Sequence, residues 1–425
     1  MSASLTVWLL QTGEPLPVDA DNPRPMRAMN LASALVAAGH SVVLWSSAFN
    51  HQEKRHRVTG TQRILVAPRL EVRLIASPGY QRNIGLARLW DHAMLARNLA
   101  RELAREHTVP DVAFIGFPPI ETAAVMARWL ARRAIPCVVD VKDQWPDIFI
   151  EPLPRWLRPL GRAALVPYYF YARRAMQDAT SLSAMADSFL RWATGFCGRP
   201  LTPLDRVVPL TTPAGQVSAA ELELAGQWWD QQGIREDGAA RVFFVGTHTA
   251  AFDMEPVRKA ASALAAAGST CQFVIAGSGP SSADWHRSMD GVPNVHFPGW
   301  IDRARIEALA RRSTAALAPY RNTDDFMMSI PNKVIDALAL GVPLLSPLRG
   351  EVLGLITGFG VGMAYGKGSG VTLEQVITRL KAEPQLRAAM SSKAHALYCE
   401  RFSFETVYGG LVDFLERLAR SGRTP

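Results

Sequence analysis

The chain alternates strand-like and helix-like segments twice over, and this repeated alternation restricts its fold more than any other feature. Near the start, a strand-like run from Ser4 to Leu10 precedes a polar loop and a helical segment from Met26 to Ala38. A second strand-like run follows at His40 to Ser46, and the same order restarts at Arg241 to Val245. Strand–helix–strand units predict parallel sheets covered by helices. We therefore expect an α/β fold with two Rossmann-like, doubly wound domains facing a central cleft.

The connection between the two series runs from Thr211 to Gly238 and is rich in Pro, Gly, Gln and acidic residues. We accordingly place an N-terminal domain at 1–212 and a second domain at 213–395. The last segment, 396–425, contains an amphipathic helix that we expect to pack back toward the N-terminal domain. The four cysteines stand far apart with neither pairing nor metal-ligand spacing, which is typical of reduced core residues in a cytoplasmic protein.

The net charge of +8 is confined to one half of the sequence. Residues 1–212 hold 25 Lys and Arg against 17 Asp and Glu, whereas residues 213–425 hold 21 of each. A basic half indicates an anionic membrane surface, a phosphorylated substrate or a nucleic acid as partner, or simply an arginine-rich surface. Since no run of about 18 apolar residues occurs, no membrane-spanning helix is expected. The start lacks a basic n-region, so we predict no signal peptide.

Residues 326–353 read as loop, short helix, strand and loop, with polar groups at each junction. Pro331 suits the first turn of a helix, and Gly341 ends that helix. Lys333 and Asp336 lie three residues apart on it. The loop that follows the strand Leu344 to Ser346 lies at a carboxyl strand end, where open α/β sheets bind ligands.

The N-terminal half offers several charged candidates. Arg24 and Arg27 stand at a helix start, where free backbone N–H groups favour an anion, although both arginines are equally consistent with solvated positions. The loop from Phe49 to Arg57 is densely polar and cationic, which indicates an anion-facing or a disordered loop rather than a metal site. Asp143 follows a buried strand, so it is either a site residue or a cap of the next turn.

Residues 151–175 alternate arginines with Trp, Leu and clustered Tyr, a composition typical of an interfacial membrane segment. Several prolines within it argue against one straight helix. The alternative is a core element with solvent-facing arginines.

The C-terminal half resembles retaining glycosyltransferases of the GT-B fold, family 4. The resemblance is carried by VFFVG at 242–246, VIAGSGP at 274–280, NVHFPGW at 294–300, ALAPY at 316–320 and the stretch 326–353. The N-terminal half matches more loosely, through Gly13, the Gly39-His40 pair and the DQWP segment at 143–146. That segment and the loop from Phe49 to Arg57 are similar to a branch of the family that builds bacterial surface polysaccharides.

The resemblance implies a nucleotide diphosphate sugar, with UDP as the expected nucleotide, held by the second domain. Donor-binding positions would be Gly246, His248, Gly277, Ser278, Gly279, Trp300, Ile301, Lys333, Asp336, Arg349, Gly350, Glu351, Val352 and Leu353. Asp336 would bind the ribose, where the family usually has Glu. Acceptor-binding positions would be Gly13, Arg24, Arg27, His51, Lys54 and Arg55. Asp143 would orient the acceptor or the transferred sugar.

Two departures from the family pattern bear on the diphosphate. The family often has an acid eight residues before the ribose-binding one, where this chain has Met328. It also often has an Arg after the glycine of the first strand, and a Lys further on, but neither follows Gly246. The leaving diphosphate still needs charge neutralisation. We therefore assign that role first to Lys333, then to Arg349, and third to His248.

We expect a metal-independent, retaining glycosyltransferase that needs no cofactor and extends a polyprenyl-diphosphate-linked saccharide in surface polysaccharide assembly. It would be cytoplasmic and peripheral at the inner face of the cell membrane. The two alternatives are a nucleotide-sugar 2-epimerase, which lacks an acceptor, and a non-catalytic protein that binds a nucleotide sugar or an anionic polymer. The arginines are dispersed and no nucleic-acid-binding module is apparent, so no nucleic acid partner is expected.

Overall fold

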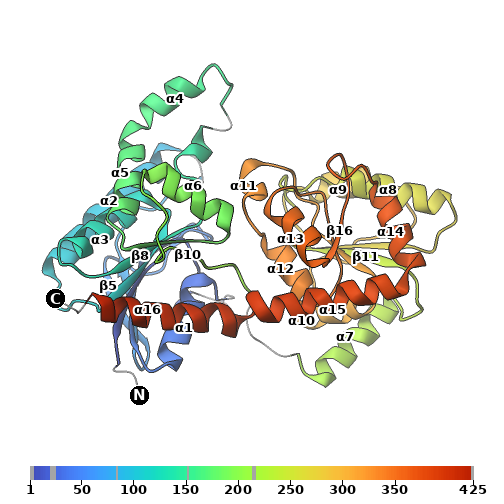
Figure 1. Ribbon diagram of the computed structural model, residues 1–425, viewed down its shortest axis with the longest axis horizontal. Helices are drawn as coiled ribbons and strands as arrows, with labels where there is room; N and C mark the ends of the chain where they lie inside the picture. Colours follow the sequence, from blue (N-terminus) through green and yellow to red (C-terminus); the bar gives the residue numbers. More distant parts are fainter. Residues whose placement is uncertain (1–3, 20–24, 83–84, 151–152, 213–216, 423–425) are drawn as a thin grey trace. The chain divides into compact units, whose positions relative to one another are not determined.

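The computed structural model describes residues 4–19, 25–82, 85–150, 153–212 and 217–422. By its internal contacts the chain forms two compact units (Figure 1). Unit 1 comprises Met1–Pro209 and Val407–Pro425, and unit 2 comprises Leu210–Thr406. The first boundary lies three residues before the predicted one, and the chain returns to unit 1 eleven residues after the predicted position 396.

The sheet of unit 1 is parallel except at one edge. Its strand order is β10-β9-β8-β7-β1-β2-β6-β5, and only the β5–β6 pair at that edge is antiparallel. The strands are β1 (Thr6–Leu10), β2 (Ser41–Ser47), β5 (Gln62–Ala67), β6 (Leu70–Ile75), β7 (Val112–Phe117), β8 (Cys137–Val141), β9 (Ser181–Ala184) and β10 (Arg206–Val207). The central strands β7 and β8 are buried along their whole length, as expected for strands covered by helices on both faces.

The helices of unit 1 are α1 (Arg27–Ala37), α2 (Leu86–Arg105), α3 (Ile120–Ala131), α4 (Arg158–Ala164), α5 (Val166–Gln177), α6 (Asp187–Cys197) and α16 (Gly410–Ser421). A 3₁₀ turn spans Asp147–Phe149. The loop from Phe49 to Arg57 contains a short antiparallel hairpin of β3 (Phe49–Asn50) and β4 (Arg55–His56), which the sequence did not predict. The basic and aromatic segment forms two helices, α4 and α5, and α4 lies farther from the sheet than α5 (Figure 1).

Three tryptophans pack together in unit 1, two of them fully buried in its core. Trp8 meets Trp45 edge-on at 5.0 Å between ring centroids and stacks on Trp129 at 5.4 Å. Such aromatic pairs stabilise the fold by about 0.5–1.5 kcal/mol beyond their burial. Helix α16 packs on unit 1 through its buried apolar face. Its Glu416 Oε1 lies at hydrogen-bond distance, 3.1 Å, from His40 Nε2.

The sheet of unit 2 is parallel throughout, in the order β13-β12-β11-β14-β15-β16. Its strands are β11 (Arg241–Val245), β12 (Gln272–Ala276), β13 (Val295–His296), β14 (Ala315–Leu317), β15 (Leu344–Ser346) and β16 (Gly362–Ala364). Its helices are α7 (Ala219–Gln231), α8 (Glu255–Ala266), α9 (Ser282–Ser288), α10 (Arg303–Arg311), α11 (Asp324–Met327), α12 (Asn332–Ala339), α13 (Glu351–Phe359), α14 (Leu373–Ala382) and α15 (Pro384–Arg401). A π-helical turn at Glu405–Gly409 precedes α16. Both units are therefore doubly wound α/β folds, as predicted.

Helix α15 belongs to unit 2 although its last residues lie in the predicted C-terminal segment. Its Ala394 and Leu397 share a buried cluster with Ile335 and Leu338 of α12. This packing holds the segment up to Thr406 in unit 2.

The structure also shows where the four cysteines lie and whether any helix could span a membrane. Cys137, Cys197 and Cys271 are buried and free, but Cys399 is exposed, so the prediction of a core position was wrong for that residue. It lies on the solvent side of α15 near His395. Among the described residues, no helix is long and apolar enough to cross a membrane.

Candidate active site

Two loops at the carboxyl ends of β11 and β12 touch through their backbones in unit 2. Gly277 has a φ of 124°, and a Cβ there would lie 2.0 Å from the carbonyl oxygen of Gly246. A Cβ at Gly279 would lie 2.5 Å from the carbonyl oxygen of His248. The amide of His248 donates to the carbonyl of Ser278 at 3.1 Å. These glycines are therefore required by the close approach of the two loops.

Lys333 of α12 reaches the end of β11. Its ammonium donates to the carbonyl of Val245 and lies 4.6 Å from the ring centroid of Phe244. A Cβ at Gly246 would fall 1.8 Å from Nζ, so glycine at 246 leaves the space that the ammonium occupies. Burial lowers the pKa of Lys333 to about 8, and the nearby Asp336 carboxylate acts in the opposite direction. A half-buried cation thus lies at the loop that follows β11, and this loop contains no Arg or Lys of its own.

Helix α12 begins at Asn332 with Pro331 as its N-cap, where the sequence predicted its start. Asp336 lies one turn after the helix start and is half-buried. The charge of Asp336 also raises the pKa of Tyr320, although burial of that phenol contributes more. Lys333 and Asp336 are thus brought together at one end of the sheet.

The loop predicted at 347–351 ends earlier, because helix α13 begins at Glu351. Gly350 caps it with a φ of 68°, and a Cβ there would lie 2.0 Å from the carbonyl oxygen of Met327. Val352 is buried and Leu353 is half-buried in the first turn. The first amides of an α-helix lack intrahelical acceptors and favour an anion. The apolar run after Gly350 is the sequence signal for this helix, which the prediction missed.

The other predicted donor-binding residues differ in how far their side chains are exposed to solvent. Arg349 is exposed, and its amide donates to Asn322 Oδ1 at 2.8 Å. Trp300 is 71% exposed, whereas Ile301 is buried. His248 is fully buried, stacks on Trp285 at 4.3 Å between centroids, and its Nδ1 pairs with Ser282 Oγ at 3.0 Å. Burial lowers the pKa of His248, so this packed, neutral ring is unsuited to neutralising a diphosphate.

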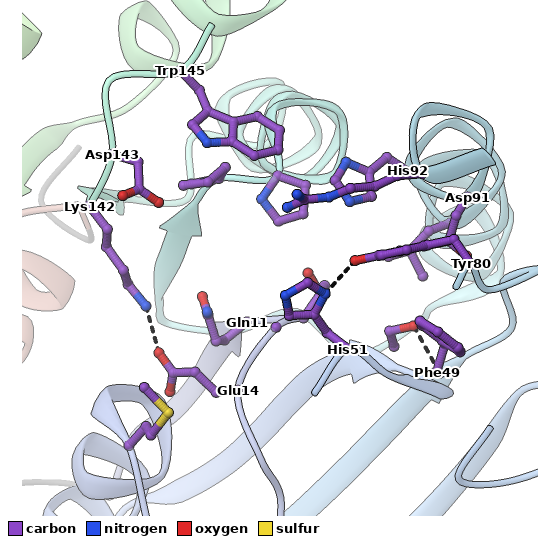
Figure 2. Close-up of a pocket in the computed structure, with 18 residues that line it drawn as sticks. Gln11, Glu14, Phe49, His51, Tyr80, Asp91, His92, Lys142, Asp143 and Trp145 are labelled. Carbon is purple, nitrogen blue, oxygen red and sulfur yellow. Dashed lines mark hydrogen bonds and ion pairs between the residues drawn. The ribbon is translucent and has the colours of Figure 1, made fainter. Parts of the chain in front are cut away.

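Unit 1 contains a cavity of about 260 Å³ at the carboxyl ends of its central strands (Figure 2). It is lined by residues 11–14 after β1, by residues between 47 and 51 at the end of β2, by 118–119 after β7 and by residues between 142 and 145 after β8. Met26, Tyr80 and one face of α2 complete the lining. Parallel strands end at the same edge, so segments far apart in sequence meet there.

One side of this cavity holds carboxylates and a lysine (Figure 2). Lys142 Nζ lies 2.6 Å from Glu14 Oε1, and Glu14 Oε2 accepts from the amide of Ala28 at 2.8 Å. The carboxylate of Glu14 therefore occupies the start of α1, where the sequence predicted a ligand anion. Asp143 lines the cavity beside this pair, and burial raises its pKa against the opposing charges of Lys142 and Arg88.

Arg27 is committed to the interior of unit 1. Its Nε and Nη2 donate to Asp140 at 2.6 and 2.8 Å, and further N–H groups donate to the carbonyls of Val208 and Pro209. The side chains of Arg27 and Asp140 are both buried. Arg27 therefore forms a structural ion pair with Asp140, and its side chain is not placed to contact an acceptor as the sequence predicted. Arg24, predicted beside it, lies outside the described residues.

The charged and polar residues of the loop from Phe49 to Arg57 have different environments, and among His51, Lys54, Arg55 and Arg57 only His51 lines the cavity. Arg57 pairs with Asp19 at 2.6 Å and donates to the carbonyls of Ser47 and Phe49, so it anchors the hairpin. Arg55 is exposed and pairs with Glu53. Two further loop residues, His51 and Lys54, lie 3.3 Å apart (Nδ1 to Nζ). Gly13 also lines the cavity, with open space where a Cβ would project.

On the far side of the cavity, the predicted residue His51 contacts a group of residues that the sequence prediction missed. His51 Nδ1 pairs with the hydroxyl of Tyr80 (Figure 2). The Arg88 guanidinium lies 5.0 Å from the ring centroid of Trp145, on which His92 stacks at 5.9 Å. No local pattern relates these positions, because they converge only through the sheet topology.

Behind this wall lies a buried carboxyl–imidazole pair. His92 Nδ1 is 3.8 Å from Glu121 Oε2. Burial, followed by the charge of Arg88, lowers the pKa of His92 to about 3. Burial also raises the pKa of Glu121 to about 6. His92 is therefore neutral at pH 7 and contributes its ring to the aromatic wall of the cavity. Within the described residues, no group of three or more His, Cys, Asp or Glu is arranged to hold a metal ion.

Residues 239–360 match the family model described as glycosyl transferases group 1. The match covers the two glycine-containing loops, α12 and α13. No curated protein matches the chain.

Solved structures resemble nearly the whole chain at low sequence identity. Sucrose-phosphate synthase from Thermosynechococcus elongatus has a TM-score of 0.68 and 14% identity, covering 98% of this chain and 100% of that one. HepE from Anabaena in complex with UDP has a TM-score of 0.64 and 14% identity, covering 97% and 100%. WaaG, a glycosyltransferase involved in lipopolysaccharide biosynthesis, has a TM-score of 0.63 and 13% identity, covering 97% and 99%. The chain therefore has the GT-B fold.

Proposed function

We propose that this protein is a glycosyltransferase that moves a sugar from a nucleotide diphosphate sugar to an acceptor. The observation that carries the proposal is the placement of Lys333 against Gly246 within the segment matched to glycosyl transferases group 1. Two complexes of structurally similar proteins, HepE with UDP and HepE with UDP-glucose, support UDP as the nucleotide.

The donor would lie against the carboxyl ends of the unit 2 strands. The diphosphate would meet the Lys333 ammonium and the first amides of α13, with Arg349 as a second cation. Asp336 would accept from the ribose hydroxyls, and the exposed ring of Trp300 would lie by the base. We assign the acceptor to the cavity of unit 1, where Asp143 would orient a hydroxyl group.

The reaction we propose retains the anomeric configuration. The bond between the anomeric carbon and the diphosphate oxygen breaks, and the acceptor oxygen bonds to the same face of that carbon. The acceptor proton passes to the leaving diphosphate, so no protein base is assigned. Lys333 neutralises the negative charge that develops on the leaving group.

The direct test is release of nucleoside diphosphate and formation of glycoside from a panel of UDP- and other activated sugars, with polyprenyl-diphosphate-linked saccharides as acceptors. Lys333→Ala should lower kcat about 100- to 1,000-fold, as expected for loss of a group that stabilises transition-state charge. Lys259→Ala, on the exposed face of α8, is the matched control. Unchanged turnover in Lys333→Ala would remove the diphosphate assignment, and donor epimerisation without acceptor would favour the 2-epimerase alternative.

The finer proposal is a lipid-linked acceptor in surface polysaccharide assembly, with the protein peripheral at the inner face of the membrane. It rests on an apolar and basic surface along α4 and α5. Five large apolar side chains there are 52–75% exposed: Trp156, Leu160, Val166, Phe170 and Tyr171. Arg155, Arg162, Arg173 and Arg174 are exposed among them. Exposed aromatic and basic side chains on one surface suit an anionic bilayer interface.

Flotation with vesicles tests this surface. The protein should bind vesicles containing phosphatidylglycerol and bind neutral phosphatidylcholine vesicles much less. Trp156→Ser combined with Phe170→Ser should abolish flotation, while Trp300→Ser, equally exposed but in unit 2, should not. Equal binding of both vesicle types, or no effect of the double variant, would contradict membrane attachment through α4 and α5.

A further inference from the structure

Two aromatic rings lie next to the ammonium of Lys333 in unit 2. Its Nζ is 4.6 Å from the ring centroid of Phe244 and 5.4 Å from that of Phe252. Both distances are within the 6 Å over which a ring face attracts a cation. The ammonium also donates to the backbone carbonyl of Val245. Phe244 belongs to β11, Phe252 to the loop that follows it, and Lys333 to α12. We call Phe244 and Phe252 the Lys333 ring pair.

The core of unit 2 holds the Lys333 ring pair in place. The two rings meet edge-on at 4.9 Å between centroids. Trp285 of α9 lies 5.5 Å from Phe244 and 6.2 Å from Phe252. Phe252 also forms a backbone bridge with Tyr320, and their rings are 4.6 Å apart. Phe244 is fully buried and Phe252 is 6% exposed. The positions of both rings are therefore set by the core rather than by the flexible lysine side chain.

A ring face attracts an ammonium without neutralising it. The attraction comes from the quadrupole of the ring, and a carbonyl oxygen adds only a partial charge. Burial disfavours the charged form of Lys333 and lowers its pKa to about 8. The charge of Asp336 acts in the opposite direction, although we assign that carboxylate to the ribose. The ring pair offsets part of the cost of burial and leaves the positive charge available to a diphosphate.

We propose that Phe244 and Phe252 are positioning residues that hold the Lys333 ammonium charged and in place for the diphosphate of the donor. This inference rests on the proposed function, because it takes Lys333 as the group that meets the diphosphate. The rings would act through Lys333 and would not touch the substrate. Their effect would be to order the cation before the donor binds, which lowers the entropic cost of binding.

Ring fluorination at position 252 tests the attraction while nearly preserving the shape of the side chain. Fluorine withdraws electron density from the ring face and so weakens its attraction for a cation. We would introduce phenylalanine with one, two or three ring fluorines there and follow the Nζ signal of Lys333 by NMR as pH rises, without any donor. The signal is assigned by its loss in Lys333→Arg. The pKa of Lys333 should fall with each added fluorine, by about half a pH unit in total.

Phe273 of β12 provides the matched control for these changes. It is fully buried in the same core cluster. It pairs with Val242 of β11, three residues before the Val245 carbonyl that accepts from the ammonium. Three residues of strand correspond to about 10 Å. The same fluorines at position 273 should therefore leave the pKa of Lys333 unchanged.

Calorimetric titration with UDP and with uridine connects the rings with the donor. Three fluorines at position 252 should weaken UDP binding about two- to fivefold at pH 8, and Phe252→Leu should weaken it about tenfold. Uridine lacks the diphosphate, so its affinity should not change in either protein. Phe273→Leu removes a ring from the same core and should change neither affinity.

Three results would contradict parts of this proposal. A constant pKa of Lys333 through the fluorine series at position 252 would overturn the positioning role of the rings. Equal losses of affinity for UDP and for uridine would also overturn it, because they would indicate general damage to unit 2. A lowered pKa with unchanged UDP affinity would support the contact between the rings and Lys333 but contradict the role of Lys333 in the proposed function. Failure of the inference is thus distinguishable from failure of the proposed function.

Discussion

The two candidate binding regions are built from different parts of the chain. In unit 2 the backbone dominates: glycines bring two loops together, a helix start supplies amides, and one lysine ammonium lies against Gly246. In unit 1 the cavity is lined by residues from segments that are far apart in the sequence. A site made of backbone and one cation suits the diphosphate, a group common to all such donors. A site made of side chains is free to change with the acceptor.

The largest expected effect distinguishes Arg27, a structural residue of unit 1, from the residues that line the cavity of that unit. Arg27→Met should destabilise the protein by about 3–5 kcal/mol, because it leaves the Asp140 carboxylate buried without its partner. Urea unfolding followed by circular dichroism measures this change. Arg55→Met, exposed on the hairpin, should stay within about 0.5 kcal/mol of the parent. Loss of acceptor binding in Arg27→Met without loss of stability would restore the ligand-binding interpretation.

The next prediction tests whether unit 2 needs glycine, which has no side chain, at position 246. Gly246→Ala should lower kcat/KM about 100-fold or more, because the new methyl would take the place of the Lys333 ammonium and because a φ of 148° is strained for alanine. Steady-state kinetics with varied donor measures it. Gly291→Ala, another glycine of unit 2 with positive φ but open space around it, controls for backbone strain. Comparable losses in both variants would contradict the specific role of the space at Gly246.

A smaller effect concerns the charge of Lys333. Its folded pKa of about 8 is below the ordinary 10.5, so the cost of burying the ammonium is present below pH 8 and is relieved as pH rises. Donor binding needs the charged form, so the dissociation constant should rise by up to about tenfold per pH unit above pH 8. Fluorescence titration with UDP from pH 7 to 10 checks this. Lys333→Arg should abolish the inflection, and an inflection at the same pH in that variant would assign it elsewhere.

The smallest expected effect is that of metal removal. We expect transfer to proceed unchanged in excess EDTA, because Lys333 and the start of α13 would take the place of a divalent ion on the diphosphate. Activity assays with and without EDTA, followed by added Mg²⁺ or Mn²⁺, measure this. Loss of activity that a divalent ion restores would show that the backbone-built site is incomplete without metal.

The sequence by itself determined the order of elements and the elements on which several candidate residues lie. Apolar runs and the glycines that end helices predicted both doubly wound folds, because both signals are visible in short stretches of sequence. They also placed Lys333 and Asp336 on one helix and Asp143 at the end of a buried strand, and the structure has α12 at Asn332–Ala339 and β8 at Cys137–Val141. The start of α13 was missed because a glycine before an apolar run fits a loop as well as a helix.

Only the tertiary structure decided which charged groups face a cavity. Arg27 and Asp140 are 113 residues apart and pair because α1 and β8 belong to the same unit. The buried ring of His248, the Glu14–Lys142 pair and the convergence of Arg88 on Tyr80 depend likewise on strand order. A charge in a sequence has no intrinsic burial, since its environment is set by residues brought near by the sheet. The sequence thus specified the scaffold and the chemical groups, and the packing of distant segments determined their roles.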